Sequence, residues 1–239
     1  MCINYTPPKP RVLAHLQEDL NLCHVWPRET WQDYDAPILV QGDGGERRVL
    51  LASYGMLPKR KCSPELRRYT TMNARAETIG KLTTYKAAWS TSRLCLVPME
   101  RFYEPYYAEG APSPVRYAIG MADESLFAVA GLWRSWDEED GSVSHSFTQI
   151  TINSDEHPLM RRFHKPGDEK RSLVIVPREE YDDWLGCKDP ERARAYLNLY
   201  PAELMGCAPA PVPPRKPKSA PVSGGKPSQP ATAPLDLTQ

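Results

Sequence analysis

Short apolar or alternating segments recur along the first 207 residues, and they are rich in β-branched and aromatic side chains. Segments of this length and composition are typical of β-strands when turn residues bound them. Glycine- and aspartate-rich stretches at 42–45, 110–112 and 140–141 supply such turns. The predicted strands are residues 48–54, 93–97, 115–120, 126–133, 146–152 and 172–176.

Helical periodicity is less frequent than strand patterning. Residues 178–185 and 190–199 carry apolar side chains at helical spacing, and Asp189 is a suitable N-cap for the second segment. Residues 76–89 include a further candidate helix. Many strands with few helices predict an α+β fold: a single strand-rich domain with a barrel-like, mostly antiparallel sheet and flanking helices.

The composition changes at about residue 208, where proline, alanine, serine and lysine become dominant. A segment with so few bulky apolar residues cannot offset its chain entropy by burial. We therefore predict a folded domain at 1–207 and a disordered tail at 208–239. The tail is either a solubilising extension or a weak tether for nucleic acid or a partner, and the sequence leaves both open.

The 239-residue chain has a formal net charge of zero and six cysteines. A neutral chain disfavours recognition of nucleic acid by bulk charge, so any DNA contact would need a local basic patch. The candidate cations for such a patch are Lys59, Arg60, Lys61, Arg67, Arg68, Arg161 and Arg162. The cysteines form no CxxC pair or zinc-binding spacing, so no metal site is expected. The chain lacks a signal-peptide pattern and an apolar run of about 18 residues, and we expect a reduced, cytoplasmic protein without membrane contact.

Cys2 directly follows the initiator methionine. Removal of Met1 would leave an amine with a pKa of about 7.7–8.0 beside a thiol with a pKa of about 8.5. The amine can attack an aldehyde to give an imine, and the thiol can then close a thiazolidine ring. The same residue type also suits an N-terminal-nucleophile hydrolase. A cysteine placed there by chance remains the plain alternative.

Three further segments carry candidate side chains. Asn73 and Arg75 offer an orienting amide and a phosphate-binding guanidinium, or else they begin a helix. Glu104 follows a strand among aromatic residues and could exchange protons, or it is a surface glutamate. The segment 156–166 holds two histidines, His157 and His164, together with cations suited to a phosphate backbone.

Taken together and in this order, these residues resemble the SOS-response-associated peptidase (SRAP) family. The matching features are Cys2, the segments 54–58, 73–77, 102–104 and 130–133, Thr151 and His164. The resemblance runs from Cys2 to about residue 204, and the segment 73–77 and the Cys2 start are its most specific parts.

The resemblance implies that Met1 is removed and that Cys2 forms a thiazolidine crosslink with an abasic site, shielding the lesion in single-stranded DNA during the DNA damage (SOS) response. Asn73 would position the α-amine, Glu104 would act as acid and base, and His164 would assist opening of the sugar ring and reversal of the crosslink. Arg75 would bind a phosphate. The other expected DNA contacts are Tyr54, Gly55, Met56, Thr151, Arg161 and Arg162. An aromatic or apolar side chain of the segment 54–58 could stack on a base.

This chain departs from the family pattern after His164, where Lys165 and Pro166 follow directly. That departure makes His157 the competitor for the histidine role, although we favour His164. The resemblance implies no cofactor, and we expect a monomer associated with the nucleoid. The expected activities are thiol-dependent removal of Met1, crosslinking and β-elimination (lyase) through the imine. Two alternatives stay open: a thiol peptidase acting on other proteins, and a non-catalytic single-stranded DNA-binding module.

Overall fold

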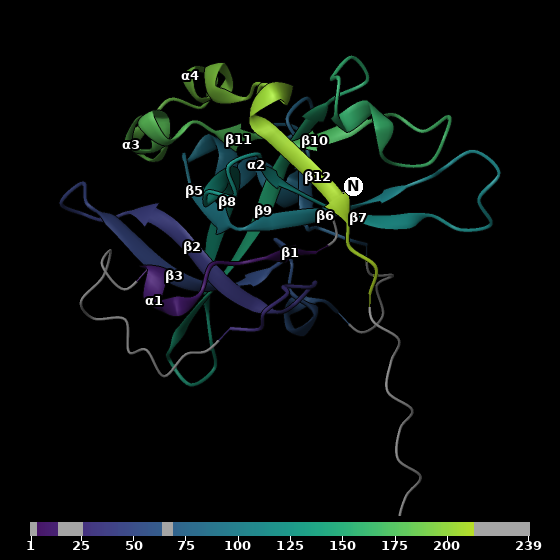
Figure 1. Cartoon of the computed structure of the whole chain (residues 1–239). Helices are drawn as coiled ribbons and strands as arrows, with labels where there is room; N and C mark the ends of the chain where they lie inside the picture. Colours follow the sequence, from purple (N-terminus) through teal and green to yellow (C-terminus); the bar gives the residue numbers. More distant parts are fainter. Residues whose placement is uncertain (1–3, 14–25, 64–68, 213–239) are drawn as a thin grey trace, which may run out of the picture.

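A computed structural model describes residues 4–13, 26–63 and 69–212 (Figure 1). Five strands close into a barrel: β2 (Asp35–Gln41), β3 (Arg47–Tyr54), β5 (Leu94–Met99), β8 (Phe127–Asp137) and β9 (Val143–Asn153). All neighbouring pairs are antiparallel except β3 with β9, which is parallel and closes the barrel. The predicted strand-rich α+β fold is therefore confirmed.

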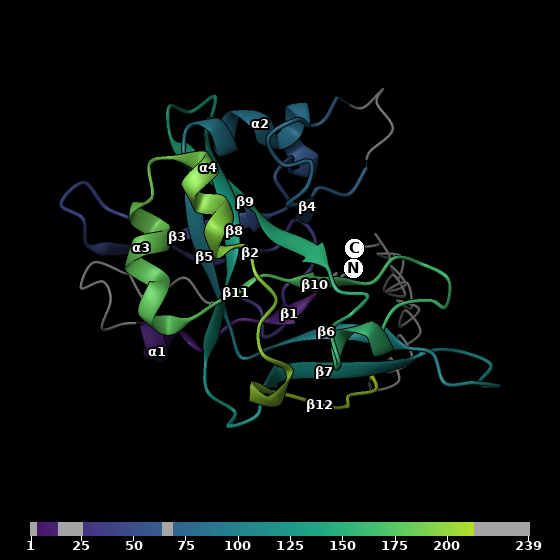
Figure 2. The ribbon, with the colours of Figure 1, turned by 90° about the horizontal axis from the view of Figure 1, so that it is seen from above.

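A second, fully antiparallel sheet lies beside the barrel and has the order β1-β6-β7-β12. Its strands are β1 (Tyr5–Thr6), β6 (Arg101–Tyr106), β7 (Val115–Met121) and β12 (Met205–Pro209). Figure 2 shows β1 running beside β6, with the β6–β7 hairpin projecting away from the barrel. This sheet brings the first described residues of the chain next to β6.

Three short strands extend the barrel sheet. β4 (Asn73–Arg75) and β10 (Arg171–Leu173) both pair with β9, whereas β11 (Ile175–Val176) pairs with β8. β4 runs parallel to β9 and places Asn73 opposite Gln149. Residues 73–77 thus begin as a strand, and a helix start at Asn73 is excluded.

The helices are short and cover one side of the barrel. α3 (Tyr181–Gly186) and α4 (Pro190–Ala193) lie across the barrel from the projecting β6–β7 hairpin in both overall views (Figures 1 and 2). Asp189 caps α4, because its Oδ1 accepts a hydrogen bond from the Glu191 amide at 2.9 Å. The other α-helices in the described residues are α1 (Pro10–Leu13) and α2 (Thr83–Ser90).

The predicted helices were correct in place but not always in length. The segment 178–185 is a 3₁₀ turn, Arg178–Glu180, that continues into α3. In the segment 190–199, α4 passes into a 3₁₀ turn that ends at Tyr196. Only the part of 76–89 that begins at Thr83 is helical.

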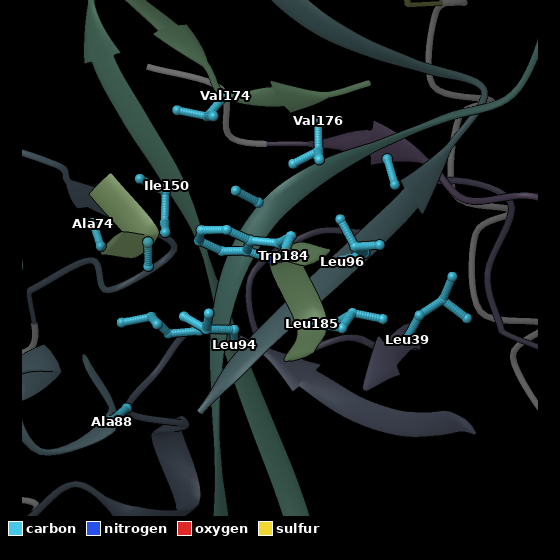
Figure 3. Packing of buried hydrophobic residues seen from close by; sticks show 14 of the residues in the cluster. Leu39, Ala74, Ala88, Leu94, Leu96, Ile150, Val174, Val176, Trp184 and Leu185 are labelled. Atoms are coloured by element: carbon cyan, nitrogen blue, oxygen red, sulfur yellow. The ribbon is translucent and has the colours of Figure 1, made fainter. Parts of the chain in front are cut away.

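Two buried clusters form the core, one on each face of the barrel sheet. Trp184 of α3 packs among Leu94, Leu96 and Leu185 in the first cluster, as Figure 3 shows. The Trp184 indole also donates to the Cys95 carbonyl at 2.9 Å, which satisfies its polar atom inside the core. This packing explains why α3 is held against β5.

Gly131 in β8 allows a close approach inside the barrel. A Cβ atom there would lie 2.7 Å from the Thr148 carbonyl oxygen and 2.8 Å from the Cys95 sulfur. Any larger residue would therefore push β8 away from β5 or β9 and open the barrel.

Besides the very short strands β1 and β4, three strands were not predicted from sequence: β2, β6 and β12. Each contains a proline, and proline within an apolar run argues against a central strand. β12 includes Ala208 and Pro209, so the strand continues past residue 207 into the segment assigned to the tail. The rest of the predicted disordered tail, residues 213–239, lies outside the described part of the chain.

Candidate active site

A buried carboxylate and a buried imidazole meet between β6 and the loop that follows the 3₁₀ turn Met160–Arg162. Glu104 Oε2 lies 3.0 Å from His164 Nε2, and the two side chains are only 2% and 7% exposed. The distance is that of an ion pair, without the alignment of a linear hydrogen bond. A carboxylate and an imidazole this close can exchange a proton with each other and with a bound substrate.

The backbone holds His164 against β6. The His164 amide donates to the Pro105 carbonyl at 3.0 Å, and the preceding residue, Phe163, forms a bridge with Tyr106. His164 has a positive φ of 64°, a conformation that is uncommon for residues other than glycine. Such backbone strain persists where the surrounding structure enforces it, and it is concentrated at functional sites.

His157 has a different environment from His164. Its Nδ1 accepts hydrogen bonds from the amides of Leu159 (3.1 Å) and Met160 (3.0 Å), so Nε2 carries the proton and donates to the Tyr200 carbonyl at 2.8 Å. Both ring nitrogens are thereby occupied by backbone groups. The geometry favours a structural role for His157 and leaves His164 as the histidine beside a carboxylate.

The first described residues of the chain lie beside Glu104. Tyr5 pairs with Phe102 of β6 on one side and with Thr30 on the other. The Asn4 carbonyl accepts a hydrogen bond from the amide of Tyr103, the neighbour of Glu104, at 3.3 Å. Cys2, the predicted nucleophile, lies outside the described residues.

A network of side chains that sequence reasoning missed surrounds Asn4. Glu29 Oε2 accepts hydrogen bonds from Asn4 Nδ2 at 3.0 Å and from Arg116 Nη2 at 2.8 Å. The Arg116 guanidinium carbon lies 3.3 Å from the centre of the Tyr103 ring, and the Tyr103 hydroxyl is 2.8 Å from Thr6 Oγ1. No local sequence pattern indicates this network, because its members come from four separate segments.

Asn73 is joined to the N-terminal strand through the core. It lies opposite Gln149, whose Oε1 accepts a hydrogen bond from the Tyr54 hydroxyl at 2.9 Å. The Tyr54 ring contacts the edge of the Tyr5 ring, with ring centres 5.5 Å apart. These contacts fix the relative position of β4 and β1.

The residues expected to contact DNA divide into buried and exposed groups. Tyr54, Met56 and Thr151 are fully buried, and Gly55 is buried in a turn with a φ of 123°. A base therefore cannot stack on Tyr54 or Met56, and the stacking expected of this segment is corrected accordingly. The reason is that Tyr54 stacks on Phe147 instead, with ring centres 5.1 Å apart.

Arg161 and Arg162 are exposed on the 3₁₀ turn that precedes His164. They are therefore accessible to a phosphate backbone. Of the other cations expected nearby, Arg60 and Lys61 both contact Glu138, at 3.5 and 2.8 Å. The two remaining arginines, 67 and 68, lie outside the described residues.

Arg75 belongs to a four-residue ion network. Arg75 Nη1 lies 2.7 Å from Glu169 Oε2, and Glu169 Oε1 lies 2.7 Å from Nη1 of Arg171. Arg171 is 3% exposed and also donates to both carboxylate oxygens of Glu77, each at 2.9 Å. Sequence reasoning missed Arg171, because its partners Glu77 and Thr151 come from other segments.

The network changes the ionisation of its acidic members. The hydrogen bond from Arg171 lowers the pKa of Glu169, and Arg75 contributes in the same direction. Partial burial raises the pKa of Glu77, but the Arg171 hydrogen bonds and charge outweigh it, so the net shift is downward. Both carboxylates are therefore charged at neutral pH.

Within the described residues, no group of three or more metal-ligating side chains occurs. Complete burial raises the pKa of the Cys95 thiol well above its ordinary value, which makes that cysteine a poor nucleophile. No helix in the described part of the chain is long and apolar enough to cross a membrane.

Comparison with known proteins gives consistent results. The family described as SOS response associated peptidase (SRAP) matches residues 21–212. The abasic site processing protein YobE of Bacillus subtilis is 29% identical over 171 residues, which is 70% of this chain and 73% of that protein. The abasic site processing protein HMCES of Xenopus tropicalis is 27% identical and covers 67% of this chain, which corresponds to 52% of its own length.

Solved structures share the fold. A crystal structure of a protein from Bordetella bronchiseptica superposes with a TM-score of 0.75 and 28% identity, covering 88% of this chain and all of that one. A protein from Bacteroides thetaiotaomicron gives a TM-score of 0.66 at 21% identity, with 86% and 90% covered. The second likeness concerns the fold alone.

Proposed function

Because the chain belongs to the SOS response associated peptidase (SRAP) family, we propose that it captures abasic sites in single-stranded DNA through a covalent bond to Cys2. The observation that carries this proposal is the buried Glu104–His164 pair beside the start of the chain. The abasic site processing proteins of Bacillus subtilis and Xenopus tropicalis are its relatives, which supports the choice of lesion.

Covalent geometry supports the involvement of Cys2. One residue, Ile3, lies between Cys2 and Asn4, so their Cα atoms are at most about 7 Å apart. Asn4 is hydrogen-bonded to Tyr103, next to Glu104. Covalent connectivity therefore keeps Cys2 within about 7 Å of Asn4, which is paired with the residue before Glu104.

The proposed reaction begins with hydrolysis of the Met1–Cys2 peptide bond, which frees the α-amine. The amine adds to the aldehyde carbon of the ring-opened abasic sugar and forms a carbinolamine. Loss of one water then gives an imine, and the thiol adds to the imine carbon while its proton passes to nitrogen. The product is a thiazolidine, and the capture step releases one water.

Glu104 and His164 are suited to the proton transfers in this sequence. Glu104 would donate a proton to the departing hydroxyl and take it back during reversal. His164 Nδ1 is buried and has no hydrogen-bond partner among the described residues, so it is available to the sugar oxygen during ring opening. Asn73 would orient the α-amine, and Arg75, Arg161 and Arg162 would bind the flanking phosphates.

The same site accommodates two related activities. The imine permits β-elimination of the strand, which would appear as lyase activity. Hydrolysis of the Met1–Cys2 peptide bond by the protein itself would be a peptidase activity that needs no other protein as substrate. The competing functions are a peptidase acting on other proteins and a non-catalytic DNA-binding module. Intact-mass analysis distinguishes abasic-site capture from both.

The experiment is intact-mass analysis of the purified protein before and after incubation with a single-stranded oligonucleotide that carries one abasic site. We expect loss of Met1 and a stable adduct equal to the oligonucleotide mass minus one water. An undamaged oligonucleotide and a Cys187→Ala variant serve as controls for the lesion and for a half-buried thiol. A protein that retains Met1 and forms no adduct contradicts the proposal.

A further inference from the structure

Arg75 is not available as an unpaired cation. Its guanidinium is half-exposed, and its Nη1 lies 2.7 Å from the Glu169 carboxylate. The network that contains this pair consists of two arginines and two glutamates, Arg75, Arg171, Glu77 and Glu169. Their charges sum to zero, so the network itself offers no net positive charge to a polyanion at the residue expected to bind phosphate.

Glu169 is held in place from the protein side. Its Oε1 accepts hydrogen bonds from Nη1 of Arg171 at 2.7 Å and from Asn153 Nδ2 at 3.3 Å. Arg171 is itself anchored by Glu77 and by the Thr151 carbonyl, which it contacts at 2.7 Å. The other carboxylate oxygen, Oε2, is therefore presented to Arg75 in a stable position.

A carboxylate and a phosphate present similar acceptor oxygens to an arginine, and both pair with the same guanidinium edge. We propose that Glu169 occupies the phosphate position at Arg75 and thereby limits the affinity of the protein for undamaged single-stranded DNA. This inference rests on the proposed function, in which Arg75 contacts a phosphate.

The competition would serve selectivity for the lesion. An undamaged strand can gain only noncovalent contacts, and it must displace Glu169 to gain the contact with Arg75. It therefore dissociates readily. A strand with an abasic site is retained by the covalent bond to Cys2, which does not depend on Arg75. Weak noncovalent binding thus reduces occupation of the site by the excess of undamaged DNA.

The segment that carries Glu169 supports this role. It lies between His164 and β10 and is tied down by Lys170, whose ammonium donates to the carbonyls of His164 at 3.3 Å and Lys165 at 2.9 Å. The Lys170 amide donates to Asp155 Oδ1 at 2.8 Å. The loop that follows the site histidine therefore also supplies the carboxylate that pairs with Arg75.

The test compares Glu169→Gln with Asp168→Asn in the full-length protein. Both changes remove one negative charge from the same loop, but Asp168 is exposed and has no contact with Arg75 among the described residues. Glutamine keeps the size of Glu169 and an acceptor for Arg171, while it loses the charge that neutralises Arg75. Binding to an undamaged oligonucleotide is measured by fluorescence anisotropy over a range of salt concentrations.

We expect E169Q to tighten binding about two- to fivefold, the range of one exposed ion pair. The slope of log Kd against log salt should become steeper by about 0.7, which corresponds to one additional phosphate contact on a single strand. Crosslinking of an abasic strand should become more sensitive to undamaged competitor by the same factor. D168N should change these quantities by much less.

A double-mutant cycle with Arg75→Ala tests whether the gain in DNA affinity of E169Q depends on Arg75. The gain from E169Q should disappear in the R75A background, because no guanidinium remains to be released. An equal gain with and without Arg75, or an equal effect of D168N, would overturn the inference in favour of a general charge effect. Weaker binding by E169Q would also overturn it, since Glu169 would then orient Arg75 for phosphate.

Thermal unfolding is measured for each variant, because Glu169 also contacts Arg171. If E169Q is unstable, Glu169→Asp provides the same test: it keeps the charge and withdraws it from Arg75 by one methylene, so a smaller gain in affinity is expected. An unchanged affinity for E169D would count against the inference. If the wild-type protein crosslinks an abasic strand but E169Q shows no gain in affinity for undamaged DNA, this inference alone is overturned. If the wild-type protein binds no single-stranded DNA, both this inference and the proposed function are overturned.

Discussion

His164 Nε2 lies 3.0 Å from Glu104 Oε2, and both side chains are withdrawn from solvent. The contact joins a residue of β6 to a loop residue far along the chain, and the hydrogen bond from the His164 amide to the Pro105 carbonyl holds the two segments together. Within the described residues this pair is the arrangement best suited to proton transfer beside the N-terminal strand.

Glu104→Gln should slow crosslinking by about 10²–10⁴-fold at saturating DNA, because glutamine cannot exchange a proton during loss of water from the carbinolamine. The affinity for an undamaged strand should change little. Glu109→Gln is the matched control, since Glu109 is an exposed glutamate in the same hairpin. Single-turnover kinetics with an abasic oligonucleotide provide the measurement, and a wild-type rate for E104Q would remove Glu104 from the mechanism.

Substitution of the two histidines should affect different properties: crosslinking for His164 and folding stability for His157. His164→Ala should alter the rate of crosslink formation or reversal. His157→Ala should instead cost about 2–3 kcal/mol of folding free energy, because buried or half-buried backbone groups at residues 159, 160 and 200 lose their partner. Thermal denaturation and crosslinking rates of both variants decide the assignment. If H157A folds normally but fails to crosslink, the histidine roles are reversed.

Cys2→Ser should retain the α-amine but lose formation of the stable ring, because a hydroxyl is a much weaker nucleophile than a thiol. We expect a labile imine that borohydride reduction converts into a stable adduct. Without reduction, the adduct should be lost on heating. A heat-stable adduct formed by C2S without reduction would show that the sulfur is not needed.

Glu29 and Arg116 are expected to act as positioning residues, because they hold Asn4 two residues after Cys2. Arg116→Met should lower the crosslinking rate constant about 10- to 100-fold, in line with the effect of a small misplacement of reacting groups. The Kd for DNA should not change. Arg116→Lys should restore little, since lysine cannot reproduce the guanidinium stacking on Tyr103.

The contradicting outcome is a rate that falls only in proportion to the folded fraction. A parallel decrease in affinity and rate would likewise indicate a general structural effect. Glu29→Gln is the milder companion variant, because it keeps an acceptor for Asn4 while removing the charge opposite Arg116.

Acid should weaken the Arg171 network. The pKa values of Glu77 and Glu169 are lowered in the folded protein. Their contribution to stability is therefore complete above the unfolded pKa of about 4.3 and is lost as pH falls through the lower folded values. The difference in Tm between wild type and Glu77→Gln should be largest near neutral pH and should shrink below about pH 4. A difference independent of pH would exclude this ionic contribution.

Local patterns were sufficient for much of the fold. The strands at 48–54, 115–120 and 146–152 correspond to β3, β7 and β9 because each alternates or concentrates β-branched and aromatic residues between turn signals. β2, β6 and β12 could not be predicted in this way. Each is stabilised by pairing with neighbours that the local pattern does not reveal.

In the candidate site, too, some features were predictable from the sequence and others depend on tertiary contacts. Cys2, Asn73, Glu104 and His164 were selected from the sequence because a family resemblance joined weak individual signals. The sequence could not exclude His157, whose role depends on amides and a carbonyl that folding brings around its ring. It also suggested that Tyr54 could stack on a base, whereas that ring packs inside the core on Phe147.

By itself, then, the sequence determined the strand-rich fold class, the chemistry available at Cys2 and the identity of the acid–base candidates. These depend on residue type and on short-range periodicity, which are properties of the chain alone. Only the tertiary structure decided that Glu104 meets His164, that Glu29 and Arg116 anchor Asn4, and that Glu169 neutralises Arg75. Each of those contacts joins segments remote in sequence, and their distances follow from barrel closure and strand register rather than from any local pattern.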